Sequence, residues 1–175
     1  MSTKTAGPDC LPDTDSQPDF NRRHVLGWVA AAPALLAAYG ATRAVAEELP
    51  AMTVFRDPSC GCCHKWVEHV RADGFSVAVH DAASMKAVKA RLGVPAELAS
   101  CHTAEVGGYV IEGHVPAVAI RRLLVERPQG RGIAVPGMPI GSPGMEGGAP
   151  EAYDVVLFGA GEPRVFGRFR EASPI

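Results

Sequence analysis

The chain is predicted to be an α/β protein in which a central mixed sheet is flanked by helices. Near the start of the predicted domain, segments that alternate apolar and polar residues are separated by segments with helical spacing. Near the C-terminus, two alternating segments surround Gly159-Ala160-Gly161, which indicates a hairpin. The strand–helix–strand order predicts a parallel strand pair joined by a right-handed crossover.

The first half of the domain is predicted to contain two strands and two helices. Apolar side chains from Cys63 to Val70 recur at helical spacing, and Ser84 or Asp81 suits the cap of the second helix. In chain order, we expect a strand over residues 52–57, a helix that Asp73-Gly74 ends, a strand over residues 75–80, and a helix with Met85, Val88 and Leu92 inward that Gly93 ends.

The second half is predicted to begin with a loop over residues 95–108, which places a Cys-His insertion around Cys101. A short strand over residues 109–112 follows. Pro116 begins a helix that presents Val118, Ile120, Leu123 and Leu124. Residues 130–150 are rich in Gly and Pro, and residues 153–158 and 164–170 form the C-terminal β-hairpin. The order of these elements is thioredoxin-like.

The first 46 residues of the 175-residue chain predict an export signal with a polar N-terminal extension. Arg22-Arg23 form a twin-arginine pair, residues 25–41 are rich in Ala, Leu and Val, and Ala44-Val45-Ala46 has the small-x-small pattern of a cleavage site. The apolar stretch is short for a membrane span. We therefore expect twin-arginine export, cleavage after Ala46, a periplasmic domain over residues 47–175 and no stable membrane anchor.

The predicted mature chain is nearly neutral, with 13 lysines and arginines against 15 aspartates and glutamates. It has no basic stripe, which argues against a nucleic-acid partner. About 130 residues can bury a real core, so stability need not depend on disulfides. Four cysteines remain after processing, and an oxidising compartment permits disulfides between them.

Cys60-Gly61-Cys62-Cys63 concentrates three thiols where a loop enters the first predicted helix. Unpaired N–H groups and the dipole of a helix N-terminus favour thiolates, which are soft ligands for Cu(I) and also for zinc. Cys60 and Cys63 also have the C-x-x-C spacing of a thioredoxin-type redox site. Structural disulfides alone are an awkward alternative, because the adjacent Cys62 and Cys63 would close only a strained ring.

Cys101-His102 adds a fourth sulfur and an imidazole about forty residues later. The polar neighbours Ser100 and Thr103 favour a ligand over a cysteine that merely fills apolar space. His114, just before Val115-Pro116, could face the same site. Zinc would accept three cysteines and one histidine, or four cysteines.

Met138 and Met145 lie in two copies of the turn sequence Pro-Gly-Met, seven residues apart. A thioether is a soft ligand that favours Cu(I) over zinc, so these residues discriminate between the two metals. The alternative is that each methionine covers the hydrophobic edge of a loop.

Several motifs follow one another in order along the predicted domain. They are Cys60-Gly61-Cys62-Cys63 with Trp66, Ser100-Cys101-His102-Thr103-Ala104, Gly108-Tyr109-Val110, Glu112-Gly113-His114-Val115-Pro116, and the run from Ala134 to Glu146. On these motifs the chain, from about Thr53 to Phe169, resembles the small bacterial copper-resistance proteins of the CopG type.

The resemblance implies a thioredoxin-like fold, a periplasmic role in copper handling, and a cysteine-bridged cluster of several copper ions. It leaves open whether the protein is an enzyme, a copper oxidoreductase that interconverts Cu(I) and Cu(II). We expect more than one Cu(I) ion on four thiolates, with the other ligand candidates completing or shielding the site, and other periplasmic copper-handling proteins as partners. The candidate residues are Cys60, Cys62, Cys63, Cys101, His102, His114, Met138 and Met145.

Two other functions remain open. A thiol–disulfide oxidoreductase would use Cys60 as nucleophile and Cys63 as resolving thiol, and Cys62 would then be dispensable. A zinc-stabilised, partner-binding domain would hold one zinc ion tightly and would unfold on chelation.

Overall fold

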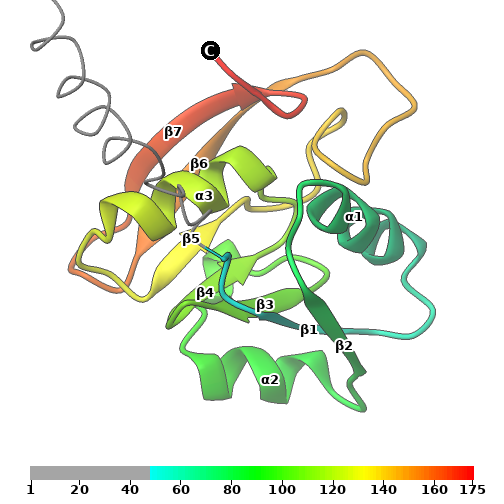
Figure 1. Ribbon diagram of the computed structural model, residues 1–175, viewed down its shortest axis with the longest axis vertical. Coiled ribbons are helices and arrows are strands. Elements are labelled where there is room, and N and C mark those ends of the chain that lie inside the picture. Colours follow the sequence, from blue (N-terminus) through cyan, green and yellow to red (C-terminus); the bar gives the residue numbers. More distant parts are fainter. Residues whose placement is uncertain (1–47) are drawn as a thin grey trace, which may run out of the picture. The chain divides into compact units, whose positions relative to one another are not determined.

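The computed structural model describes residues 48–175, so the predicted export signal lies outside the described residues. Within this range the chain forms an eight-stranded mixed sheet in the order β2-β1-β3-β4-β5-β6-β7-β8 (Figure 1). The predicted α/β class, with helices flanking a mixed sheet, is confirmed. The elements are β1 Met52–Arg56, α1 Gly61–Ala72, β2 Val77–Asp81, α2 Met85–Leu92, a 3-10 turn Ala96–Leu98, β3 Thr103–Val106, β4 Tyr109–Glu112, α3 Ala117–Glu126, β5 Gly132–Ala134, β6 Ala152–Phe158, β7 Arg164–Arg170 and β8 Ser173–Pro174.

Helices α1 and α3 lie on one face of the sheet and α2 lies on the other (Figure 1). Successive strand residues alternate between the two faces, so neighbours in sequence join different parts of the core. Ile111 and Ile133 pack in the larger cluster with residues of α1 and α3. Val110 and Ala134 pack in the smaller cluster with Leu92 of α2.

The first part of the domain follows the predicted order. Strands β1 and β2 are parallel, with Met52 opposite Val77. The hydroxyl of Ser84 accepts a hydrogen bond from the backbone N–H of Ala87 and so caps α2, and Gly93 ends that helix in the left-handed conformation, with φ at 73°.

The segment over residues 95–108 is not the continuous loop that the sequence suggested. It contains β3, which lies in the middle of the sheet and pairs antiparallel with both β1 and β4. Gly107 and Gly108 both have positive φ and form the tight turn between β3 and β4. The predicted Cys-His insertion is therefore reduced to the residues between the 3-10 turn and β3.

Two further details differ from the prediction. The Gly- and Pro-rich segment contains β5, which pairs with β4 and β6. In α3, Val118 is 43% exposed, while the small residues Ala117 and Ala119 face the core. The predicted C-terminal hairpin of β6 and β7 is confirmed, with a bulge between Val155 and Val156.

None of the helices in residues 48–175 is both long enough and apolar enough to cross a membrane.

Gly132→Ala is expected to lower the free energy of unfolding by roughly 2–3 kcal/mol, because overpacking a well-filled position displaces backbone. A Cβ on Gly132 would fall on the Val110 carbonyl, in the pairing of β4 with β5. Gly61→Ala is the matched control, since nothing lies within 4 Å of its Cβ position. Urea unfolding of both variants measures the difference, and equal stabilities would contradict the packing.

Candidate metal centre

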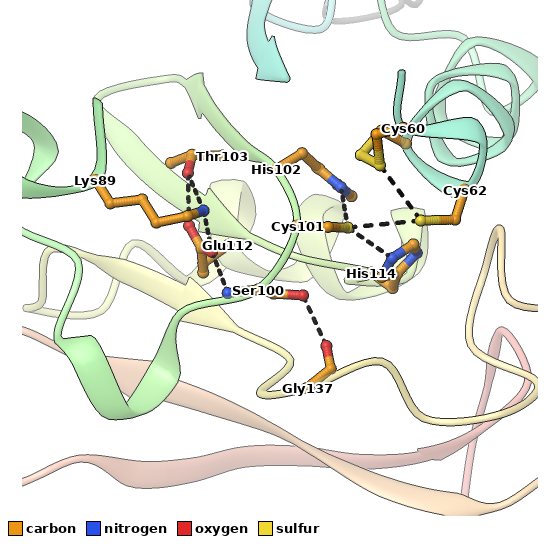
Figure 2. A network of polar contacts seen from close by, with 11 residues as sticks. Cys60, Cys62, Lys89, Ser100, Cys101, His102, Thr103, Glu112, His114 and Gly137 are labelled. Atoms are coloured by element: carbon orange, nitrogen blue, oxygen red, sulfur yellow. Dashed lines mark hydrogen bonds and ion pairs between the residues drawn. A yellow bond between two sulfur atoms is a disulfide. The ribbon is translucent and has the colours of Figure 1, made fainter. Parts of the chain in front are cut away.

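Four cysteines from two distant segments meet at the N-terminal end of α1. The sulfurs of Cys60, Cys62, Cys63 and Cys101 all lie within 4.8 Å of one another. Cys60 is the N-cap residue of α1, and Cys62 and Cys63 lie in its first turn. Cys101 comes from the segment before β3, and its side chain points toward Cys62 and the two imidazoles (Figure 2).

A tight turn positions the first three thiols. The carboxylate of Asp57 accepts hydrogen bonds from the backbone N–H and the hydroxyl of Ser59, at 2.8 and 2.5 Å. These bonds lower the pKa of Asp57. The backbone N–H of Cys60 donates to the Asp57 carbonyl at 3.1 Å, so the chain turns directly from β1 into α1.

Cys60 and Cys63 are joined by a disulfide, whereas Cys62 and Cys101 are free thiols. The sulfur of Cys62 lies 3.4 Å from that of Cys60 and 3.8 Å from that of Cys101. A metal site that uses all four cysteines as thiolates therefore requires reduction of this disulfide.

His114 directs one ring nitrogen at the sulfur of Cys101. Its Nδ1 lies 2.7 Å from the carbonyl oxygen of Pro143, which can only accept a hydrogen bond, so Nδ1 carries the proton. Its Nε2 then offers a lone pair, 3.0 Å from the Cys101 sulfur. The Pro143 carbonyl thus orients a candidate ligand nitrogen, in the manner typical of groups behind a metal ligand.

His102 is fully buried beside the same sulfur. Its Nδ1 lies 3.3 Å from the Cys101 sulfur, and its ring contacts those of Trp66 and His114, with centroids 4.3 and 5.1 Å apart. Its Nε2 is buried without a hydrogen-bond partner among the described residues. The Nδ1 beside the Cys101 sulfur fits a donor set that can hold a soft metal ion. Cys101, His102 and His114 also form a second, overlapping group of candidate ligands.

Burial keeps the donors of this group uncharged when no metal is bound. Burial, followed by the nearby Cys62, raises the pKa of the Cys101 thiol to about 12. Burial likewise lowers the pKa of His102 well below its usual value, and it lowers the pKa of His114. The imidazoles are thus neutral and able to donate lone pairs, while the thiol must lose its proton to bind a metal.

The loop that carries the two methionines packs on the thiol cluster at one point. Gly144 has φ at 89°, and a Cβ there would lie 2.7 Å from the Cys62 carbonyl oxygen and 3.3 Å from His114 Nδ1. Met145 follows Gly144 directly and is half-buried. Met138, in contrast, is 51% exposed. The structure brings the cysteines and both histidines together, whereas Met138 faces solvent.

The sequence placed Glu112 in a family motif but predicted no role for it in the site, and it did not predict a role for Lys89. Glu112 is fully buried at the end of β4 and forms an ion pair of 2.6 Å with Lys89 of α2. The two residues are 23 positions apart, and neither position has a pattern that predicts the contact. The signals for Glu112 were its place in the motif with His114 and a charged residue at the end of an apolar strand.

Binding of Cu(I) to Cys101 is expected to release one proton and to strengthen with rising pH. Because the thiol has a pKa of about 12, it stays protonated in the metal-free protein at neutral pH. Between about pH 6 and 8, the apparent Cu(I) affinity should rise about tenfold per pH unit from this thiol alone. Competition titrations of reduced protein at several pH values measure the slope. Cys101→Ser should lower it by about one proton, and an unchanged slope would remove Cys101 from the ligand set.

Comparisons with known proteins identify relatives of this chain. A family profile described as "Protein of unknown function, DUF411" matches residues 98–145. No curated protein matches the chain. Two solved structures match, described as "Copper resistance protein copG", Form 1 and Form 2, each with 49% identity. The matches cover 70% of this chain and 98% and 99% of theirs, with TM-scores of 0.65 and 0.66. The chain therefore belongs to the CopG family of copper resistance proteins.

Proposed function

We propose that the chain is a periplasmic copper-resistance protein that binds Cu(I) through the thiolates of its four clustered cysteines. The observation that carries the proposal is the approach of the sulfurs of Cys60, Cys62, Cys63 and Cys101 to within 4.8 Å of one another. Cu(I) prefers soft thiolate ligands, and one thiolate can bridge two ions. Four sulfurs can therefore hold more than one Cu(I), and membership of a copper-resistance family favours copper over zinc.

The histidines would complete the site on the side of Cys101. Nε2 of His114 already faces that sulfur, and a copper ion would replace the thiol proton between them. The Trp66 ring and the buried His102 close the inner wall, and Trp66 is fixed by a hydrogen bond of 2.9 Å from its Nε1–H to the Val115 carbonyl. This wall keeps water from one side of the bound ions.

Copper would enter from the solvent side, because Cys60, Cys62 and Cys101 are each partly exposed. The half-buried Met145 is the methionine better placed to contribute a thioether, since Met138 faces solvent. Resistance would follow from sequestering Cu(I) or from changing the oxidation state of copper, with export to the periplasm directed by the predicted signal.

The reduced chain is expected to retain several Cu(I) ions in an anaerobic titration against a competing chelator, with metal content measured after desalting. Replacing Cys60, Cys62 or Cys63 with Ser should lower the number of ions retained, because each thiolate is a bridging donor. His64→Ala is the matched control, since this histidine is exposed on the same helix and pairs with Glu68. Its stoichiometry should equal that of the wild type.

Failure to retain copper, or a single zinc ion that copper cannot displace, would overturn the proposal. Unchanged stoichiometry in all three cysteine variants would show that copper binds elsewhere.

A second candidate function is thiol–disulfide exchange. The Cys60–Cys63 disulfide lies at the N-terminus of α1, where the helix dipole stabilises a thiolate. Cys60 is partly exposed, as the nucleophilic sulfur of a redox pair would be. Cys63 is fully buried, as the resolving sulfur would be.

Cys62→Ser separates the two functions. An oxidoreductase should keep its rate of disulfide reduction in this variant within about twofold, because Cys62 takes no part in a two-thiol exchange. A copper cluster should lose at least one ion. An insulin-reduction assay and copper analysis on the same preparation give both readings.

A further inference from the structure

A buried ion pair lies directly behind the metal centre, outside its set of candidate ligands. Glu112, the last residue of β4, is 0% exposed, and the side chain of Lys89 from α2 is 13% exposed. Figure 2 shows the two side chains meeting beside Thr103 and Ser100, on the opposite side of Cys101 from the cysteines of α1.

The Glu112 carboxylate accepts three hydrogen bonds at short distances. The Lys89 ammonium and the backbone N–H of Ser100 each donate to its Oε1 at 2.6 Å. The Thr103 hydroxyl donates to its Oε2 at 2.7 Å. Lys89 also donates to the Thr103 oxygen at 2.9 Å, so the four groups form one closed network.

The partners of this carboxylate flank the two ligand candidates. Ser100 and Thr103 lie immediately before and after Cys101-His102, so one side chain holds both ends of that segment. The backbone N–H of Gly113 donates to the His102 carbonyl at 3.0 Å, next to Glu112 in the chain. His114 follows two residues after Glu112. The C-terminal end of β4 therefore holds the Cys101 segment through Glu112, and the chain just after it carries the His114 imidazole that faces Cys101.

A buried carboxylate is unfavourable unless it is paired, and apolar side chains of similar size often stabilise a core equally well. The ion pair of Arg122 with Glu126 on α3, also at 2.6 Å, is half-exposed and joins neighbouring turns of a single helix. The pair of Glu112 with Lys89 instead joins β4, α2 and the Cys101 segment. What an apolar replacement could not reproduce is therefore the way this pair fixes the position of the Cys101 segment, rather than the stability of the core.

We propose that Glu112, with its charge balanced by Lys89, is a positioning residue that holds Cys101 and His102 against His114. The hydrogen bonds keep the Cys101 sulfur 3.0 Å from Nε2 of His114 before any metal arrives. The role in copper binding rests on the proposed function, but the position of Cys101 can be measured without copper.

The test compares variants of the metal-free full-length chain with the Cys60–Cys63 disulfide intact. Lys89→Met combined with Glu112→Leu replaces the charge pair with apolar side chains, and Glu112→Gln removes only the charge. Glu126→Gln is the control, because it also removes one carboxylate charge from an ion pair, on an exposed helix face. Each variant is treated with iodoacetamide, peptide mass spectrometry gives the rate at each cysteine, and Tm is measured in parallel.

The double variant should keep its Tm but alkylate Cys101 about tenfold faster, because its segment opens locally. Cys62 is held by α1, so its rate should change much less than that of Cys101, although the two sulfurs lie 3.8 Å apart. Glu112→Gln should show a smaller rise, since the amide oxygen can still accept from Ser100. In Cu(I) competition, the double variant should bind about tenfold more weakly, as is usual when a group behind a metal ligand is removed.

A wild-type rate at Cys101 in the folded double variant would overturn the proposal. If the double variant fails to fold, Glu112→Gln decides: a faster rate at unchanged Tm supports positioning, and an unchanged rate overturns it. The two proposals can fail separately. If the wild type retains no copper but the variants still alkylate Cys101 faster, Glu112 remains the positioning residue and the proposed copper function is removed.

Discussion

The metal centre depends on a close approach of three chain segments at Gly113. This residue has φ at 73°, and a Cβ would lie 2.6 Å from the Ser100 side chain and 2.8 Å from the Val135 carbonyl oxygen. The absence of a side chain lets the end of β4 lie against the segment before β3 and the segment after β5. Cys101 and His114, which are 13 positions apart, thereby come into contact. The Ser100 hydroxyl, which donates to the Gly137 carbonyl at 2.7 Å, connects the methionine-bearing loop to the same point.

The electrostatics of the site follow from that packing. Cys101 is partly buried beside two buried imidazoles, so its protonated form is favoured, and burial keeps the imidazoles neutral. An unpaired thiolate in such a place would be unfavourable. In the proposed function, a bound cation would supply the missing charge and would replace the thiol proton.

Short-range sequence patterns predicted the part of the site whose residues are close together in the chain. The Cys60 to Cys63 run, the helix behind it and the parallel β1–β2 pair are encoded by spacing and by turn residues within about thirty positions. β3 was missed because four residues of mixed polarity carry little periodicity, although the two glycines after them are typical of a hairpin turn. The ion pair of Glu112 with Lys89 could not be predicted, because each residue is ordinary in its own segment and only the tertiary packing joins them. The likeness to thioredoxin in particular stays a prediction.

The Cys60–Cys63 disulfide determines which donor atoms are available to bind a metal ion. While Cys60 and Cys63 are joined, Cys62 and Cys101 are the only thiols within residues 48–175, and the two histidines lie on the side of Cys101. This set contains as many nitrogens as thiol sulfurs and is harder than a set of four thiolates. Reduction of this one bond would double the number of thiol donors among Cys60, Cys62, Cys63 and Cys101, and a set of four thiolates is softer and better suited to Cu(I). In the proposed function, the capacity for copper is therefore coupled to the redox state of a single bond, because the same two sulfurs cannot form the disulfide and act as bridging thiolates at once.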